Sequence, residues 1–253
     1  MGLAIVHSRA RVGVRAPEVR VEVHLAGGLP AMSIVGLPEA AVRESKDRVR
    51  AAIQCAQFEF PARRITINLA PADLPKDGGR FDLAIALGIL AASGQLSTEA
   101  LEGWEFLGEL ALTGEIRCVD GVLAAAIAAG EAGRRLLVAP GNGPEAALAS
   151  TVEIRTARTL LEVCAALDGR KSLPLAEATP CRHVHPADLT DVRGQVLARR
   201  ALEIAAAGAH HLIFVGPPGS GKTLLASRLC GILPAPSEAE ALESASIASV
   251  RGF

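Results

Sequence analysis

The sequence predicts an α+β domain over residues 1–172, a linker over residues 173–187 and the start of an α/β phosphate-loop domain over residues 188–253. In the first part, strand and helix patterns mix without strict alternation, which is typical of α+β domains. A proline-rich stretch with neither period follows. The last part carries an apolar run, a glycine-rich loop and a helical pattern. With 253 residues and 50% hydrophobic content, the chain is long enough and apolar enough for two cores.

The first half of the predicted α+β domain has two clear strands and one amphipathic helix. Residues 18–25 alternate, with Val19, Val21, Val23 and Leu25 on one face, so we expect a half-buried strand whose partner, residues 31–35, follows the turn GGLP. Residues 38–57 predict an amphipathic helix, whose apolar positions are Ala41, Val42, Val49, Ala52 and Ile53. A second alternating strand follows, with Ile65, Ile67 and Leu69 on its apolar face.

In the second half of this domain, the sequence predicts shorter helices and strands. An apolar helix covers residues 82–93 and ends at Gly94, and two strands joined near Thr113 and Gly114 follow it. We expect a helix starting at Asp120, then a strand at residues 134–140, a short helix at residues 144–149, and a strand and a helix within residues 151–167.

The predicted linker invites a metal-site interpretation that its spacing does not support. Cys181, His183 and His185 form C-x-H-x-H with no second pair of ligands nearby. Structural zinc sites need four ligands in paired spacing, so we interpret these residues as ordinary linker residues.

The second domain follows the order helix, strand, loop and helix. Asp191 lies in a helix-cap region before a helix over residues 195–207, and residues 212–215, LIFV, predict a short buried strand. The loop GPPGSGKT comes next. Its following helix places apolar residues near helical spacing and has stop signals at Gly231 and Pro234; the apolar residues are Leu224, Leu225, Leu229 and Ile232. A further helix is expected from Ser237 to Ser244.

The loop fits G-x-x-x-x-G-K-[ST], the phosphate-binding pattern, and its strand-loop-helix context supports the match. Glycine lets consecutive backbone N–H groups point inward, where they and the helix N-terminus meet a polyphosphate. Lys222 can then neutralise the β- and γ-phosphates of ATP, and the Thr223 hydroxyl can ligate Mg²⁺. The predicted nucleotide-binding residues of the loop are Gly216, Pro217, Pro218, Gly219, Ser220, Gly221, Lys222 and Thr223.

The composition limits the classes of binding partner and the cellular compartment that we expect for this protein. A formal charge of −1 gives no global electrostatic footprint for nucleic acid or membrane, so any DNA contact must be local or lie outside this chain. An aromatic content of 3% leaves few side chains on which the bases of a single-stranded nucleic acid could stack. The five scattered cysteines do not resemble a disulfide framework, and no signal or membrane-spanning segment is visible, so we expect a cytoplasmic protein with no membrane partner.

Long strings of the sequence resemble the magnesium-chelatase-like AAA+ ATPases of the ComM/YifB type. The similarity runs from GLAIVHSRA, VEVHLAGGLPAMSIVGLPEAAVRESKDRVRAA and NLAPADLPKDGGRFDLAIALGILAASGQ to DVRGQ, GPPGSGKT and ILPAPSEAEALE. It implies an N-terminal domain with the fold of ribosomal protein S5 domain 2, an AAA+ motor using ATP and Mg²⁺, homohexameric rings, and ATP-driven DNA remodelling such as branch migration in natural transformation. It also implies that DVRGQ, with Val192 and Gln195, lies by the nucleotide base.

The N-terminal domain is also similar to the peptidase domain of Lon proteases, which use a serine and a lysine. Arg80 stands where that serine would be, and Leu123 where the lysine would be. Acyl transfer fails without a nucleophile and its base, so we expect a scaffold or partner-binding module and no peptidase.

Two alternatives to the DNA motor remain open. A magnesium chelatase motor would use the same loop, although the large domain ahead of DVRGQ argues against it. A regulatory or binding module is the other, because the acidic metal-binding motif and arginine finger of such motors have no counterpart before Phe253. We therefore expect the front part of a longer protein, which by itself binds nucleotide without efficient hydrolysis.

Overall fold

The structure, a computed structural model, describes residues 2–36, 40–76, 78–179 and 187–250. The chain divides into two compact units, Met1–Thr179 with Leu242–Phe253, and Pro180–Ala241. Both are mixtures of helices and extended segments, and each is described here by itself.

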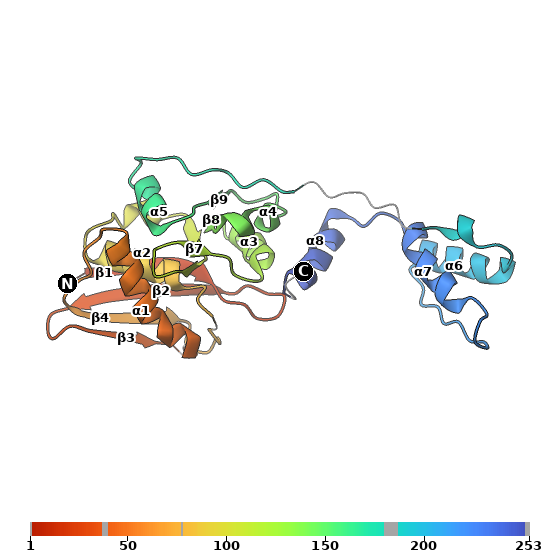
Figure 1. Ribbon diagram of the computed structural model, residues 1–253, viewed down its shortest axis with the longest axis horizontal. Coiled ribbons are helices and arrows are strands. Elements are labelled where there is room, and N and C mark those ends of the chain that lie inside the picture. The colour runs from red at the N-terminus through yellow and green to blue at the C-terminus, as the bar shows by residue number, and fades with distance from the viewer. Residues whose placement is uncertain (1, 37–39, 77, 180–186, 251–253) are drawn as a thin grey trace. The chain divides into compact units, whose positions relative to one another are not determined.

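A seven-stranded mixed sheet forms the centre of the first unit (Figure 1). Its order is β3 (Ala31–Val35), β4 (Arg64–Ala70), β2 (Glu18–Ala26), β1 (Gly2–Arg9), β5 (Trp104–Phe106), β8 (Arg135–Val138) and β9 (Ile154–Thr156). Strands β4, β2 and β1 are antiparallel neighbours, whereas β1, β5, β8 and β9 run parallel, as do β3 and β4. The unit therefore has a mixed α/β architecture built on a largely parallel sheet.

The alternation expected in β2 and β4 is confirmed. Every second side chain of the two strands faces the core, because successive side chains of a strand point to opposite faces. Each of these side chains is at most 1% exposed: Val19, Val21, Val23, Leu25, Ile65, Ile67 and Leu69. The two strands pair antiparallel over seven residues, with Val23 opposite Ile67.

Strand β1 was not predicted, although it lies at the middle of the sheet and pairs with β2 along eight residues. Its side chains are apolar on both faces: Ala4 and Val6 are buried, while Leu3 and Ile5 are exposed. Because the polar face that marks a half-buried strand is absent, the sequence shows no period of two there.

Strand β3 exists as predicted, but its predicted partner is wrong. It pairs in parallel with β4, with Ala31 opposite Arg64, and lies at the edge of the sheet. Both sides of β2 are already occupied, by β1 and β4, so a hairpin across the turn of residues 27–30 has no place.

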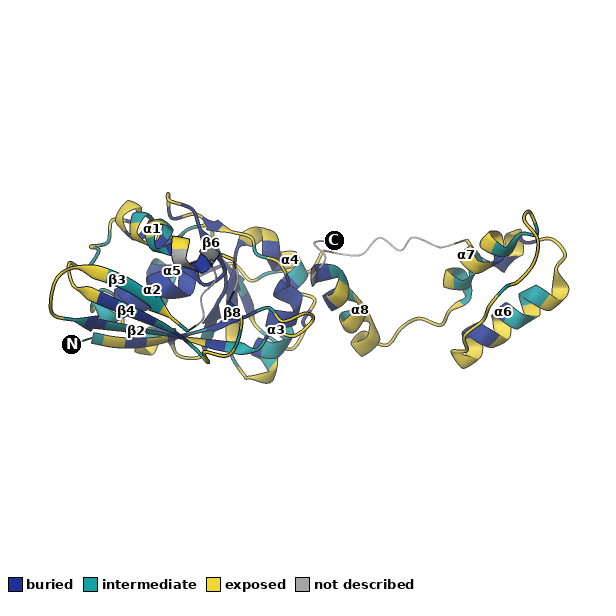
Figure 2. Cartoon of the chain, turned by 90° about the horizontal axis from the view of Figure 1, so that it is seen from below, coloured by how far each residue is buried: buried dark blue, intermediate teal, exposed yellow. Residues whose placement is uncertain are grey.

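Helices α1 (Ala40–Cys55) and α2 (Asp82–Ala92) confirm the two predicted helices of this region. Residues Asp82 to Ala91 of α2 are all buried, as expected of a helix that is apolar on every side (Figure 2). Helix α1 buries Val42, Val49, Ala52 and Ile53, and its Arg48 forms an ion pair with the buried Asp82. The side chain of Ala41 lies outside the described residues.

The rest of the first unit consists of short elements. Where the sequence predicted two strands around Gly114, the structure has three. Strand β5 joins the main sheet, while β6 (Glu109–Leu110) and β7 (Ile116–Arg117) pair with each other. The predicted helices are α3 (Val122–Glu131), α4 (Gly143–Ala146) and α5 (Leu160–Leu167), and Thr159 caps α5 by accepting the Glu162 N–H at 3.2 Å. Two 3₁₀ turns complete the unit, η1 (Glu99–Leu101) and η2 (Pro140–Asn142).

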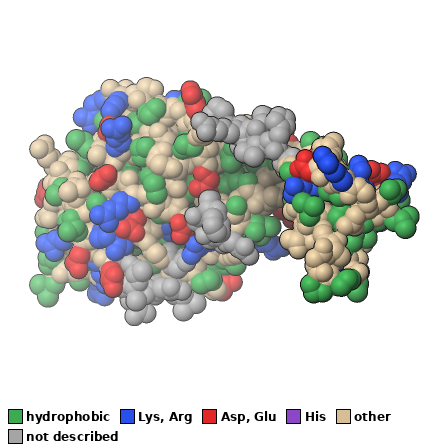
Figure 3. Space-filling model, turned by 45° about the vertical axis from the view of Figure 1, so that its right-hand side comes forward, with side chains coloured by type: hydrophobic (Ala, Val, Ile, Leu, Met, Phe, Trp, Pro, Cys, Tyr) green, Lys and Arg blue, Asp and Glu red, His purple; other side chains and the backbone are tan. Residues whose placement is uncertain are grey.

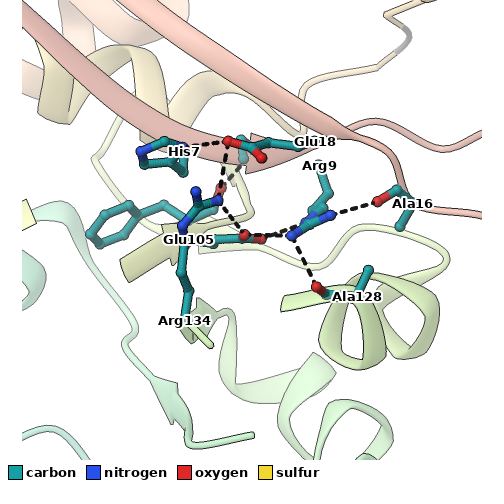
Figure 4. Close-up of polar contacts among 9 residues, drawn as sticks. His7, Arg9, Ala16, Glu18, Glu105, Ala128 and Arg134 are labelled. Carbon is teal, nitrogen blue, oxygen red and sulfur yellow. Dashed lines mark hydrogen bonds and ion pairs between the residues drawn. The ribbon is translucent and has the colours of Figure 1, made fainter. Parts of the chain in front are cut away.

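A buried ion network ties β1 to β5 and α3 (Figure 4). Arg9 donates two hydrogen bonds of 2.7 Å to Glu105, which is fully buried, and others to the carbonyls of Ala16 and Ala128. Arg134 bridges Glu105 to Glu18, and His7 contacts Glu18. Because every charge there has a partner, the network is a structural element.

The second unit is small. It contains η3 (Leu189–Asp191), α6 (Val196–Gly208) and α7 (Lys222–Ile232), which pack around four buried side chains, those of Leu189, Val192, Leu202 and Leu225. Helix α8 (Glu238–Val250) is longer than the expected Ser237–Ser244. From Leu242 onward, α8 clusters with the first unit, and Leu242 and Ala245 pack against the apolar cluster around α3.

The strand predicted at residues 212–215 is absent from the described residues, where this segment has no regular secondary structure. Ile213 is 82% exposed and Val215 is 89% exposed. A strand is defined by hydrogen bonds to a neighbour, and among the described residues no strand pairs with this segment.

The structure also differs from the prediction at the beginning of the linker. Pro174 and Ala176 exchange backbone hydrogen bonds with β9, and Leu173 is buried in the main core, so residues 173–176 pack with the first unit. None of the described helices is long and apolar enough to cross a membrane.

Candidate nucleotide-binding loop

The loop of residues 216–221 leads into the N-terminus of α7. Gly219 and Gly221 have φ values of +77° and +79°, which glycine adopts without steric cost. Helix α7 starts at Lys222, so the N–H groups of its first turn have no acceptor within the helix and lie at its positive end. A tight loop followed by such a terminus is suited to bind a phosphate group.

The ammonium of Lys222 is held inside the loop. Its Nζ donates to the carbonyl oxygens of Gly216 and Pro217, both at 2.8 Å, and to the Ser220 hydroxyl at 3.3 Å. The Ser220 hydroxyl in turn donates to the Pro217 carbonyl at 2.9 Å. In the described part of the chain, no carboxylate forms an ion pair with Lys222, so its charge is available to an anion.

The segment 191–195 contacts the loop through one side chain. The Gln195 amide donates from Nε2 to the Ser220 carbonyl at 2.9 Å. A Cβ added to Gly221 would lie 3.1 Å from the same nitrogen, so this position is closely packed as well as left-handed. Val192 is 4% exposed and belongs to the small core that supports α7.

An ion pair that the sequence did not reveal joins the same segment to α7. Arg228 donates from Nη2 to the Asp191 carboxylate at 3.1 Å, and its Nε atom is buried without a hydrogen-bond partner. The pair is 37 residues apart in sequence, so no local pattern predicts it. It fixes the 191–195 segment against the helix that carries the loop.

The predicted loop residues differ in exposure. Ser220, Gly221 and Lys222 are half-buried, and the Thr223 side chain, the expected Mg²⁺ ligand, is exposed at the start of α7. The remaining four are exposed: Gly216, Pro217, Pro218 and Gly219. An ammonium, a hydroxyl and a row of backbone N–H groups form a donor set that fits a metal-bound polyphosphate.

The two positions that we compared with the Lon dyad from the sequence have structural contacts. Arg80 is 4% exposed and donates to the backbone carbonyls of Asp120 and Arg9. Leu123 is fully buried in the cluster around α3. Neither side chain can serve as a nucleophile or a base.

Cys181, His183 and His185 lie outside the described residues, so the structure does not test their interpretation. Among the residues that are described, no group of three His, Cys, Asp or Glu side chains could hold a metal ion.

Two family profiles match the chain, and together they cover most of it. Residues 21–142 match the profile described as subunit ChlI of Mg-chelatase, and residues 188–253 match that described as magnesium chelatase, subunit ChlI.

Curated relatives align along nearly the whole chain. The competence protein ComM of Haemophilus influenzae is 54% identical over 256 residues, which cover 99% of this chain and 50% of the relative. YifB of Salmonella typhimurium is 54% identical over 254 residues, and a Mycobacterium bovis protein is 45% identical over 258 residues. The chain spans about half the length of the curated relatives it matches.

Proposed function

Because the chain belongs to the ComM/YifB family of magnesium-chelatase-like proteins, which are of the AAA+ ATPase type, we propose that residues 216–223 bind the triphosphate of Mg-ATP. The observation that carries the proposal is the placement of Lys222. Its ammonium lies within hydrogen-bond distance of three loop oxygens, at the N-terminus of α7 and with no carboxylate partner in the described part of the chain.

Each predicted site residue then has a role. Lys222 neutralises the β- and γ-phosphates, the loop N–H groups bind phosphate oxygens, and Thr223 is the protein's hydroxyl ligand for Mg²⁺. Gln195 positions the loop through Ser220, and Val192 lies in the supporting core. The bound Mg-ATP supplies the cleavable phosphoanhydride bond.

For the whole protein we propose an ATP-driven motor that remodels DNA, assembled as a homohexamer in the cytoplasm. The support is the 54% identity to a relative named for competence, the state in which bacteria take up DNA. We infer that the first unit, with Arg80 and Leu123 in structural positions, is a binding or scaffold module of this motor and has no peptidase activity. Its likeness to the S5 and Lon folds is part of this proposal.

Two other functions would use the same nucleotide site. A chelatase motor would couple ATP turnover to insertion of Mg²⁺ into a porphyrin, and a regulatory module would bind ATP without turnover. ATP turnover by the complete protein that rises with DNA and not with porphyrin would favour the DNA motor.

Binding of a fluorescent ATP analogue in the presence of Mg²⁺ tests the nucleotide site in the present chain. We expect Lys222→Ala to weaken binding by about tenfold or more, since a charged hydrogen-bond donor to phosphate is lost. Lys171→Ala removes one exposed lysine of the first unit and serves as the matched control. Equal affinity of the two variants would contradict the proposed site.

A further inference from the structure

A hollow of about 400 Å³ lies at the start of strands β3 and β4, beside α1. Its floor is mostly apolar, and its lining includes the side chains of Lys46, Asp47, Arg50, Phe60 and Arg63. Three of these side chains are cationic and one is acidic, so the hollow is locally basic although the whole chain carries a formal charge of −1.

The three cations come from two segments that line the hollow, helix α1 and the residues before β4. Lys46 and Arg50 are four residues apart on α1 and therefore share one face of the helix. Arg63 directly precedes β4 and is exposed. In the described part of the chain, none of the three forms an ion pair with a carboxylate, in contrast to the paired arginines of the core.

The guanidinium of Arg50 is oriented by an aromatic ring. Its Cζ atom lies 5.2 Å from the centroid of the Phe60 ring, a cation–π contact. A guanidinium stacked in this way keeps its edge N–H groups for a phosphate, and its other face can stack on a flat group.

On the face that Figure 3 draws, basic side chains of the first unit are interspersed with acidic ones. Figure 3 shows Lys and Arg side chains of the first unit in separate groups, with Asp and Glu between them. Any contact with a polyanion must therefore be made by a local cluster, and the hollow beside α1 offers three cations around an apolar floor.

We propose that this hollow binds single-stranded nucleic acid, with Lys46, Arg50 and Arg63 on the phosphates and the Arg50–Phe60 stack against a base. This inference rests on the proposed DNA motor and names the place where the first unit holds the strand. A nucleic acid supplies both phosphates and flat apolar bases, which the cations and the apolar floor fit together. An acidic protein segment supplies the charge, but it offers a flat partner for the stacked guanidinium only where it carries an aromatic residue.

Fluorescence anisotropy of a labelled oligothymidylate, titrated with the present chain without ATP, tests the proposal. We expect Arg50→Ala/Arg63→Ala to bind about tenfold more weakly than the unsubstituted chain. The slope of log affinity against log salt should also fall by roughly 1.4, about 0.7 for each lost phosphate contact on a single strand. Arg50→Lys keeps the charge and loses the stacked plane, so it should lie between the two.

A matched control changes the same charge elsewhere on the first unit. Arg117→Ala/Lys171→Ala removes two cations whose side chains are 60% and 51% exposed and which pair with Glu109 and Glu162. We expect this variant to bind like the unsubstituted chain. Circular dichroism of both double variants tests that they are folded. Equal loss in both double variants, or no measurable binding by the unsubstituted chain, would overturn the proposal.

A competition experiment distinguishes the proposed site from a site for acidic proteins, and a mutation experiment distinguishes it from the phosphate loop. Polyglutamate of matched charge should displace the oligonucleotide poorly, and equal displacement would identify a site for acidic proteins instead. Lys222→Ala should bind the ATP analogue more weakly and keep its affinity for the oligonucleotide, so the two sites can fail independently. Loss of oligonucleotide binding in Lys222→Ala would place the strand at the phosphate loop and overturn the inference.

Discussion

Two groups of charged residues bear on the core and on the proposed sites. Arg9 and Glu105 neutralise each other inside the core, as do Arg48 and Asp82. Lys222 and Arg50 instead have no carboxylate partner in the described part of the chain: Lys222 donates to carbonyl oxygens of the loop, and Arg50 lines the hollow beside α1. Since buried pairs are already satisfied, the unpaired cations are the ones whose charge can act on a ligand.

Asp82, at the start of α2, makes the stability of the first unit depend on pH. Burial raises the pKa of this carboxyl from 3.8 to about 6, although hydrogen bonds from Arg48 and from the Leu110 N–H lower it. The folded protein therefore holds the proton more tightly than the unfolded chain, and its stability falls as pH rises from about 4 to about 6.

We expect Asp82→Asn to remove this fall of stability with rising pH. Between pH 4 and pH 6, the free energy of unfolding of the unsubstituted chain minus that of the variant should decrease by roughly 2 kcal/mol, because the amide does not titrate. Urea denaturation at a series of pH values measures both free energies. Parallel curves over that range would show that Asp82 titrates alike in the folded and unfolded chains.

Elements were predictable where one face of a strand or helix meets the core and the other meets water. Val19 to Leu25 and Ile65 to Leu69 alternate because β2 and β4 bury one face each, and α1 shows its stripe for the same reason. Strand β1 is apolar on both faces and buries the polar side chains of Ser8 and Arg9, so its sequence carries no such signal.

Pairing between elements could not be predicted in the same way. Strand β3 reaches its partner β4 about thirty residues later, and nothing in residues 31–35 indicates that choice. Residues 212–215 have the composition of a buried strand but lack a paired neighbour in the described chain. Composition reports the preference of a segment, whereas a strand also needs hydrogen-bond partners.

The contact between α2 and the sheet depends on Gly88. A Cβ at this position would lie 2.6 Å from Cγ2 of Val23 and 3.4 Å from Cγ2 of Val6. We expect Gly88→Ala to lower the free energy of unfolding by about 1–3 kcal/mol, since overpacking a full core outweighs the better helix propensity of alanine. Urea denaturation measures the change.

Two further variants test the cause. Gly27→Ala adds a methyl group where no atom lies within 4 Å, and its effect should stay within about 0.5 kcal/mol. In Gly88→Ala/Val23→Ala the crowded methyl group is gone, so the double variant should be more stable than the sum of the single effects predicts. Strict additivity would show that α2 and β2 are not in steric contact there.

At the scale of the whole molecule, the two units differ in the size of their cores. The first unit buries a sheet, α2 and the cluster around α3, whereas the core cluster of the second has four buried residues. The phosphate loop was predictable because all its chemistry lies in eight consecutive residues. Its contact with Gln195 and the Arg228–Asp191 pair depend on how the second unit folds, and only family resemblance pointed to residues 191–195.

We expect the second unit to open more readily than the first and to be the one that Mg-ATP stabilises. Native-state hydrogen exchange should show lower protection in peptides from residues 188–241 than in those from β2, β4 and α2. A ligand at about 100 times its dissociation constant stabilises the unit that binds it by about 2.7 kcal/mol, so Mg-ATP should slow exchange in α7 and leave the sheet unchanged.

The chain's single tryptophan provides an independent measure of the first unit. Trp104 lies in β5, so its fluorescence follows unfolding of the sheet and should have the same urea midpoint with and without Mg-ATP. Lys222→Ala should abolish the slower exchange of α7 and leave the fluorescence transition in place. If Mg-ATP shifted the Trp104 midpoint as well, the two units would unfold as one cooperative body, and the nucleotide would stabilise the sheet through the second unit.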